Sequence, residues 1–283
     1  MKTLGILGPK GTHSEEAALW LKKFLREDFK LEICADIFDV LTAVKEKNFD
    51  AGLVPVENSL EGSINITLDT LARSDTLTIA RELVWPVKNF LMTKPLVEVK
   101  SVRKIFSHAQ PLAQCRKFLH KTFPDVEIIS TTSTARAAEL VAESEEICAA
   151  ICPERAGKLN GLAIAAKNIQ DNPNNFTRFF EISYRPRAAA PIETFDGDKV
   201  LIICQIDGSR AGSLCGVLEE FAKRGVNMTR IESRPARTIL GAYIFFFELE
   251  TDAGDDALRD SIRAVYDKSI WLKNLGVFPV IYA

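Results

Sequence analysis

The feature that most constrains the fold is an alternation of short apolar runs with longer amphipathic segments. TLGILG, LEICA and AGLVPVE are apolar runs, and residues 14–26 and 37–47 between them have helical periodicity. This βαβα order is typical of a parallel sheet. Because hydrophobicity within the runs is continuous, we expect helices to cover both faces of that sheet.

A second group with the same order begins near Lys104. KIFSH, VEIIS and EICAAIC are its apolar runs, and the pattern predicts helices at about 111–120 and 134–143. The sequence therefore predicts two α/β lobes, with the chain crossing between them near residues 77–100.

Residues 186–198 lack apolar periodicity and are rich in Pro, Ala and charged residues, which predicts a linker after a first region of residues 1–185. The remainder, residues 199–283, predicts a βαββαβ order, which is that of a ferredoxin-like sandwich. Its expected elements are strands at 200–206, 228–233 and 242–250, helices at 212–224 and 255–266, and a last strand near 277–281.

The charge balance argues against a polyanionic partner. The 283 residues include 36 Lys and Arg and 38 Asp and Glu, without a block of like charge. Nucleic acids and anionic membranes are bound by clustered cations. No apolar stretch approaches the ~20 residues that span a bilayer, and no signal peptide is evident. We therefore expect a cytoplasmic protein that binds a small molecule, with neither nucleic acid nor a membrane as a partner.

The six cysteines do not predict a metal or redox site. None of them forms a C-x-x-C pair, and Cys148 and Cys152 have no second Cys or His pair nearby. Reduced thiols and no metal are expected.

The first turn, GPKGTHSEE, follows an apolar run and opens a helix, so its N–H groups can hold an anion. Thr12 and Glu15 fit a capping box, in which each side chain bonds a backbone N–H of the helix start. Gly5, Gly8 and Gly11 only nearly match the dinucleotide fingerprint, and the lysine stands in the wrong place for a Walker loop. No nucleotide motif is therefore predicted.

Glu57, Asn58 and Ser59 come just after a predicted strand, where open α/β sheets bind ligands. Asn and Ser also build turns, because their side chains bond their own backbone. A functional role and turn-building are equally supported at this point.

The corresponding turn of the second lobe contains Ser107, His108 and Gln110. His108 suits a general acid because its charge changes near neutral pH. No nucleophile or partner acid lies beside it in the sequence, so a capping or supporting role is favoured. Ser133 or Thr134 is the expected N-cap of the next helix.

A polar loop at 170–175 leads into Thr177, Arg178 and Phe179 and then into an apolar strand. The planar fork of arginine suits a substrate carboxylate, and a threonine hydroxyl can donate to a leaving oxygen. The alternative is an ordinary edge strand with one exposed arginine, and the triplet alone does not decide between them.

Taken together, these segments resemble the prephenate dehydratase family. GPKGT, VPVENSLEG, SHAQ with LAQC, STA and D-x-x-x-N-x-TRF occur in the family's order and cover nearly all of residues 1–185. GSL at 212–214 and GVNMTRIESRP resemble the phenylalanine-binding ACT domain. The resemblance implies an α/β fold of two periplasmic-binding-protein-like lobes with a cleft, followed by a ferredoxin-like ACT domain.

The function implied is a monofunctional carbon–oxygen lyase of phenylalanine biosynthesis, which converts prephenate to phenylpyruvate, carbon dioxide and water without a cofactor. Thr177 is implied as the principal catalytic hydroxyl. We expect Arg178 or lobe-loop N–H groups to anchor the substrate dianion and Glu57 to serve as the proton source. The residues expected to line the cleft are Thr12, Asn58, Ser59, Ser107, Gln110 and Phe179.

The ACT resemblance implies allosteric regulation by L-phenylalanine, bound at a contact between two ACT domains of a homodimer or homotetramer. Feedback inhibition is expected, although the sequence leaves the direction of the effect open. The expected effector residues are Gly212, Ser213, Leu214, Asn227, Met228, Glu232 and Ser233.

The chain departs from the family pattern at His13, where an aromatic Phe is common, and at Ala109 and Pro111, which exchange the usual Pro and Ala. Two alternatives stay open. One is an arogenate dehydratase, which performs the same chemistry on an amino side chain. The other is a non-catalytic ligand-binding sensor, against which Thr177 and Arg178 argue.

Overall fold

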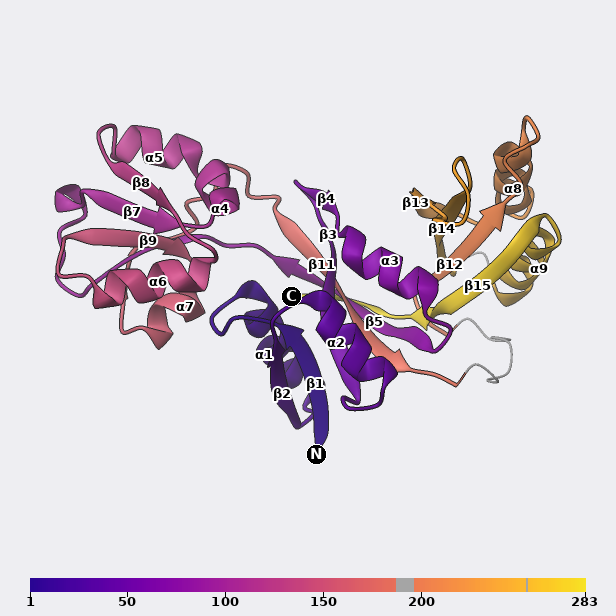
Figure 1. Cartoon of the computed structure of the whole chain (residues 1–283), viewed down its shortest axis with the longest axis horizontal. Helices are drawn as coiled ribbons and strands as arrows, with labels where there is room; N and C mark the ends of the chain where they lie inside the picture. The colour runs from indigo at the N-terminus through magenta and orange to yellow at the C-terminus, as the bar shows by residue number, and fades with distance from the viewer. Residues whose placement is uncertain (187–195, 253) are drawn as a thin grey trace.

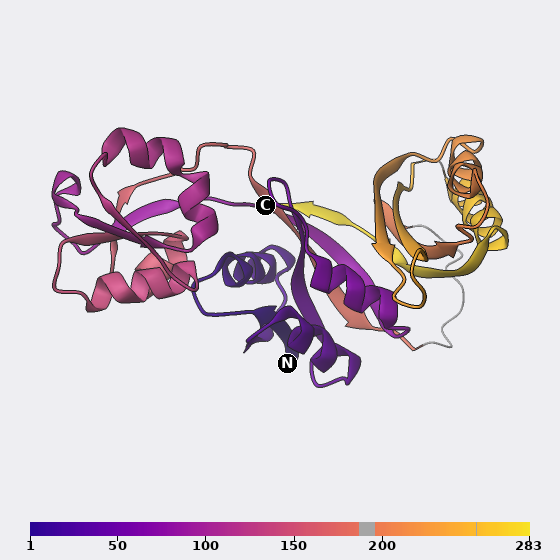
Figure 2. The same cartoon turned by 45° about the horizontal axis from the view of Figure 1, so that its top comes forward.

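The computed structural model describes residues 1–186, 196–252 and 254–283, which form three sheets. The first lobe lies in the middle of an elongated molecule, with the second lobe at one end and the C-terminal domain at the other (Figures 1 and 2). The predicted linker falls largely on residues 187–195, outside the described ranges. Within those ranges, no helix is long and apolar enough to cross a membrane.

The first lobe is built on a seven-stranded sheet. Its strands in spatial order are β16 (Val280–Tyr282), β5 (Leu77–Pro86), β11 (Phe176–Tyr184), β3 (Ala51–Asn58), β1 (Lys2–Leu7) and β2 (Phe29–Cys34), with β4 (Gly62–Ser63) paired to β3. Its helices are α1 (His13–Leu25), α2 (Ile37–Lys45) and α3 (Asn65–Arg73). β1 is parallel to β2 and β3, but β11 is antiparallel to β3 and β5. The sheet is therefore mixed, because β11, on which the chain returns from the second lobe, enters it in the antiparallel direction.

The second lobe has a five-stranded sheet in the order β10 (Ala163–Ala166), β6 (Phe90–Thr93), β9 (Cys148–Cys152), β7 (Lys104–Ser107) and β8 (Glu127–Ser130). Its helices are the short η1 (Val99–Ser101), α4 (Ala109–Gln114), α5 (Arg116–Thr122), α6 (Thr134–Glu143) and α7 (Glu154–Leu159). The helix predicted at 111–120 is interrupted at Cys115 and forms two helices. Ser133 caps α6 by accepting from the N–H of Arg136 at 3.0 Å, as predicted.

The C-terminal domain has the predicted βαββαβ order. Its sheet order is β13 (Met228–Pro235), β14 (Tyr243–Glu250), β12 (Lys199–Ile206) and β15 (Ser269–Phe278), and its helices are α8 (Ser213–Ala222) and α9 (Asp255–Asp267). The prediction of a single last strand near 277–281 was wrong. β15 begins at Ser269, where its polar residues disguise a strand, and the chain then enters β16, which pairs in parallel with β5 of the first lobe.

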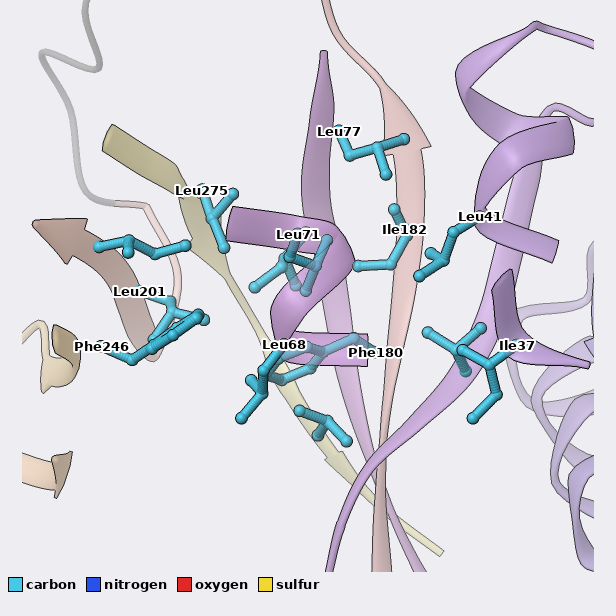
Figure 3. Packing of buried hydrophobic residues seen from close by; sticks show 14 of the residues in the cluster. Ile37, Leu41, Leu68, Leu71, Leu77, Phe180, Ile182, Leu201, Phe246 and Leu275 are labelled. Atoms are coloured by element: carbon cyan, nitrogen blue, oxygen red, sulfur yellow. The ribbon is translucent and has the colours of Figure 1, made fainter. Parts of the chain in front are cut away.

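A continuous apolar core joins the first lobe to the C-terminal domain (Figure 3). Leu68 and Leu71 of α3 belong to the same buried cluster as Phe180 of β11 and Phe246 of β14. Phe278 at the end of β15 contacts Phe180 with ring centroids 5.6 Å apart. The C-terminal domain is thus packed against the strands that carry the candidate site.

Candidate active site

The beginning of β11 carries a hydroxyl whose hydrogen bonding is set by a buried amide. Thr177 lies opposite Asn58 in the ladder of β11 and β3, and Asn58 Nδ2 donates to Thr177 Oγ1 at 3.1 Å. The same amide group donates to Asn175 Oδ1 at 2.9 Å, and Asn58 is only 7% exposed. Because Thr177 Oγ1 is the acceptor in this pair, its own proton is left to donate elsewhere.

Asn58 and Ser59 also build the turn that follows β3. Asn58 Oδ1 accepts from two N–H groups of the turn, at 3.0 and 3.2 Å. Ser59 Oγ donates to the carbonyl of Asn174 at 3.0 Å and accepts from the N–H of Phe176 at 3.0 Å. Both functions of the Ser59 hydroxyl are therefore used to fasten the polar loop before β11 to the end of β3.

Asn175 connects this cluster to the second lobe. It is fully buried, and its Nδ2 donates to Gln114 Oε1 of α4 at 3.0 Å. Gln114 Nε2 is buried and has no hydrogen-bond partner within the described part of the chain. A pocket of about 270 Å³ opens beside it, lined by residues 60–61, 113–114 and 170–172. Neither residue was assigned a role from sequence, although both stand in the patterns D-x-x-x-N-x-TRF and LAQC.

The predicted residues of the second lobe occupy different environments. Ser107 is fully buried and donates to the carbonyl of Ile151 at 2.6 Å, so the structure does not place it in the cleft. His108 is the N-cap of α4 and accepts from the N–H of Gln110 at 3.4 Å, which confirms the capping role favoured from sequence. Gln110 lies partly exposed in the first turn of α4.

The loop before α1 closes on itself and contacts the second lobe. Thr12 Oγ1 donates to the carbonyl of Pro9 at 3.0 Å. The predicted capping box is wrong, because Thr12 makes no side-chain cap and Glu15 accepts instead from the N–H of Gly11 at 2.6 Å. Glu15 also pairs with Arg155 of α7 at 2.8 Å. Burial would raise the pKa of Glu15, but the hydrogen bonds from Arg155 and Gly11 outweigh it and lower the pKa.

Arg178 and Glu57 point to the opposite side of the same two strands, since successive side chains of a strand alternate. Arg178 donates to Glu57 at 2.7 Å, to Glu82 at 2.5 and 2.9 Å, and to Glu248 at 2.5 Å. Burial opposes the charge of Arg178, but the hydrogen bond to Glu82 and the charges of Glu248 and Glu82 raise its pKa. The expectation that Arg178 anchors a substrate carboxylate does not agree with these contacts, because protein carboxylates occupy its fork.

Two further expectations are changed by this geometry. The Glu57 carboxylate, expected to supply a proton, accepts from Arg178 and lies 3.6 Å from Arg230 of β13. Phe179 is 1% exposed and belongs to the core of the first lobe with Leu4 and Leu53. Its side chain therefore packs in the core beneath β11.

Part of the expected effector site coincides with a pocket of about 260 Å³ in the C-terminal domain. Gly212, Ser213 and Leu214 line it, together with Tyr243 of β14. Asn227 and Met228 lie at the other end of β13, because Met228 pairs with Leu249 whereas Pro235 pairs with Tyr243. Asn227 donates to Glu250 at 2.7 Å.

Glu232 and Ser233 are neighbours on β13 that face different ways. Glu232 accepts from Ser63 Oγ of the first lobe at 2.7 Å. Ser233 is exposed on the other side of the strand. Within one chain, the seven expected effector residues are therefore not gathered into a single pocket.

Comparisons with known proteins agree with this architecture. Residues 4–187 match the family model for prephenate dehydratase, and residues 201–265 match that for the ACT domain. The bifunctional chorismate mutase/prephenate dehydratase of Aquifex aeolicus is 37% identical over 96% of this chain and 72% of its own length. The prephenate dehydratase of Methanocaldococcus jannaschii is 35% identical over 96% of both chains. The crystal structure of prephenate dehydratase from Arthrobacter aurescens in complex with L-Phe has 33% identity and a TM-score of 0.86, and covers 98% of this chain and 90% of its own.

Proposed function

This chain belongs to the prephenate dehydratase family and carries a C-terminal ACT domain, and we propose that it converts prephenate to phenylpyruvate with Thr177 as its catalytic hydroxyl. The observation that carries this assignment is the hydrogen bond from the buried Asn58 amide to Thr177 Oγ1.

The reaction removes a carboxylate and a hydroxyl from one ring. The bond between the ring and the carboxyl carbon breaks and releases carbon dioxide, its electron pair enters the ring, and the bond to the ring hydroxyl breaks. The departing hydroxide takes up a proton and leaves as water. Aromatisation supplies the driving force, so the protein needs chiefly to stabilise the leaving oxygen in the transition state.

Thr177 is suited to that task because Asn58 occupies its acceptor site and leaves its proton to donate. A donor held in place in this way contributes about 10²–10³ in rate. A threonine hydroxyl is a weak acid and stabilises the leaving oxygen rather than protonating it unaided. Gln114 Nε2, buried without a partner in the described ranges, offers the substrate a donor from the second lobe. Thr12 and Gln110 are proposed to complete the cleft.

The test is formation of phenylpyruvate from prephenate by the purified full chain. Thr177→Ala is expected to lower kcat about 10²–10³-fold, whereas Thr177→Ser keeps the hydroxyl and most of the rate. Thr70→Ala is the matched control, because among the described residues the Thr70 hydroxyl bonds the Ile66 carbonyl within its own helix α3. Full turnover by Thr177→Ala would refute the assignment.

Competition between prephenate and arogenate separates this activity from that of an arogenate dehydratase. If the protein converts neither substrate, a ligand-binding sensor is favoured.

Regulation is proposed to use the pocket at Gly212, Ser213 and Leu214 as the L-phenylalanine site. β13 is an edge strand of its sheet, and Ile231 on it is 46% exposed. Pairing of two ACT domains along this edge would bring Asn227, Met228 and Ser233 of a second copy to the pocket. We therefore propose a homodimer or homotetramer. The molar mass measured by light scattering after size-exclusion chromatography tests this proposal. The six unpaired cysteines agree with the reducing cytoplasm as its location.

A further inference from the structure

The two strands that carry the proposed catalytic pair present a second, different face to the ACT domain. In the ladder of β3 and β11, Asn58 lies opposite Thr177 and Glu57 lies opposite Arg178. Because side chains alternate along a strand, the first pair faces the site and the second pair faces away from it. A displacement of one pair therefore moves the other through a shared backbone.

Arg178 joins β11 directly to the ACT sheet. Its guanidinium binds Glu248 of β14 at 2.5 Å and Glu82 of β5 at 2.5 Å, and the side chains of these two glutamates are 1% and 0% exposed. Lys199 of β12 completes the cluster, at 2.8 Å from Glu248 and 3.3 Å from Glu82. Two buried carboxylates are thus neutralised by cations from both domains, and neither domain can move without disturbing the cluster.

A second contact ties the ACT domain to the hairpin of β3 and β4. Ser63 lies opposite Glu57 in that hairpin, and its hydroxyl donates to Glu232 of β13 at 2.7 Å. Arg230 of β13 donates to Ser63 Oγ at 2.6 Å and lies 3.6 Å from Glu57. The turn of this hairpin begins with Asn58 and Ser59.

β13 is therefore a two-sided strand. Arg230, Glu232 and Arg234 face the first lobe, whereas Ile231 and Ser233 are exposed on the other side. Arg234 continues the contact by binding Asp69 of α3 at 2.9 Å. A ligand that binds the exposed side of β13 can therefore displace a strand whose other side contacts the β3–β4 hairpin, which includes Asn58.

We propose that the ACT domain controls Asn58 and Thr177 through this contact, with Glu57, Ser63 and Arg178 as positioning residues. This inference rests on the function proposed above. A shift of β13 or β14 on binding L-phenylalanine pulls Ser63 and Arg178, and β3 and β11 transmit the displacement to the Asn58–Thr177 pair. Arg178 and Glu57 thus act between the ACT domain and the site, without touching substrate.

The test separates binding of L-phenylalanine from its effect. In the intact chain, Ser63→Ala removes the hydroxyl through which the β3–β4 hairpin binds Arg230 and Glu232 of β13. We expect it to bind L-phenylalanine like the parent in calorimetry, and its response is measured relative to its own turnover without L-phenylalanine. Its turnover should respond to L-phenylalanine much more weakly. Allosteric coupling ordinarily changes affinity by a factor of about 5 to 150, and we expect this factor to fall toward one when the contact is lost. Ser63→Thr keeps a hydroxyl and should keep the response.

Two further variants sharpen the comparison. Arg230→Met removes the other half of the contact and should weaken the response in the same way. Arg237→Gln is the matched control, because Arg237 lies at the same interface, 58% exposed and paired with Asp69 at 2.5 Å, without touching Ser63 or Glu57. It should respond like the parent.

Two results would overturn the inference. One is a Ser63→Ala protein that responds to L-phenylalanine as strongly as the parent. The other is a Ser63→Ala protein that no longer binds L-phenylalanine, since Glu232 and Ser63 would then belong to the effector site itself. If the parent protein forms no phenylpyruvate, the proposed function is refuted as well. This failure can be told apart from failure of the coupling alone, because it is seen in the parent before any variant is compared.

Discussion

Asn58 and Thr177 form a hydrogen-bonded pair in which the amide donates and the hydroxyl accepts. Asn58 gives its amide protons to Thr177, Asn175 and the backbone, so the hydroxyl of Thr177 is directed away from it. The chemistry at this point depends on which of the two side chains donates to the other.

Asn58→Asp should reverse that direction without changing the shape of the side chain. A carboxylate in place of the amide accepts the Thr177 proton and withholds it from the leaving oxygen. We expect kcat to fall about 10²-fold, as for loss of a positioned donor. Asn48→Asp, at an exposed position after α2, is the control. Unchanged turnover in the Asn58→Asp protein would mean that Thr177 needs no help from its neighbour.

Arg178→Lys separates a positioning role from a substrate-binding one. Lysine keeps the charge but loses the planar fork that reaches Glu57, Glu82 and Glu248 together. We expect kcat and the response to L-phenylalanine to fall while KM for prephenate stays close to that of the parent. A large rise in KM with kcat retained would instead return Arg178 to the substrate site.

The sequence placed Thr177, Asn58 and the loop before β11 among the candidates, because short polar runs beside apolar strands are local patterns. Their roles came from the family resemblance, since neither pattern alone decided between function and turn-building. The sequence did not show which residues Arg178 and Glu57 contact. A strand pattern shows that alternate side chains face opposite ways, but it does not show which domain covers each face. The partners of Arg178 lie 70 to 121 residues away in the chain.

At the scale of elements, the alternation of strands and helices in each unit was predicted, but the direction of β11 was not. Apolar runs at β1, β3 and β9 predicted the lobes, and the βαββαβ pattern predicted the C-terminal domain. The antiparallel pairing of β11 with β3 and β5 depends on where the chain returns from the second lobe, which hydrophobicity does not encode.

The attachment of β14 to β11 gives the protein a pH-dependent stability. Burial opposes the charge of Glu248, but Arg178 and Lys199 outweigh it and lower its pKa below the ordinary 4.5. A carboxyl with a lowered pKa contributes stability that is fully present above its unfolded value and is lost as pH falls through its folded value.

Glu248→Gln should therefore destabilise the protein most near neutral pH. Breaking a buried ion pair from one side costs about 3–5 kcal/mol. Urea denaturation of parent and variant should show the full gap in unfolding free energy above pH 4.5, and this gap should narrow as pH falls through the lowered pKa of Glu248. A gap that stays the same across this range would mean that the charge of Glu248 is not what holds the domains together.

At the scale of the whole molecule, the first lobe and the ACT domain share one core and should unfold together. Phe278 is fully buried and contacts Phe180 across the junction. Phe278→Ala should cost about 3–5 kcal/mol and lower a single calorimetric transition that includes both units. Two separate calorimetric transitions, with only one shifted in temperature by the substitution, would show that the shared core does not make the first lobe and the ACT domain unfold cooperatively.

The parallel pairing of β16 with β5 attaches the end of the ACT domain to the first lobe, in addition to the shared core. The ACT domain therefore has less freedom to rotate against the first lobe than a domain that is held by its buried interface alone. The same feature limits transplantation of the domain. Removing the ACT domain by a cut at one boundary would also remove β16 from the first lobe and leave β5 as an unpaired edge strand. Unpaired edge strands tend to pair with other chains.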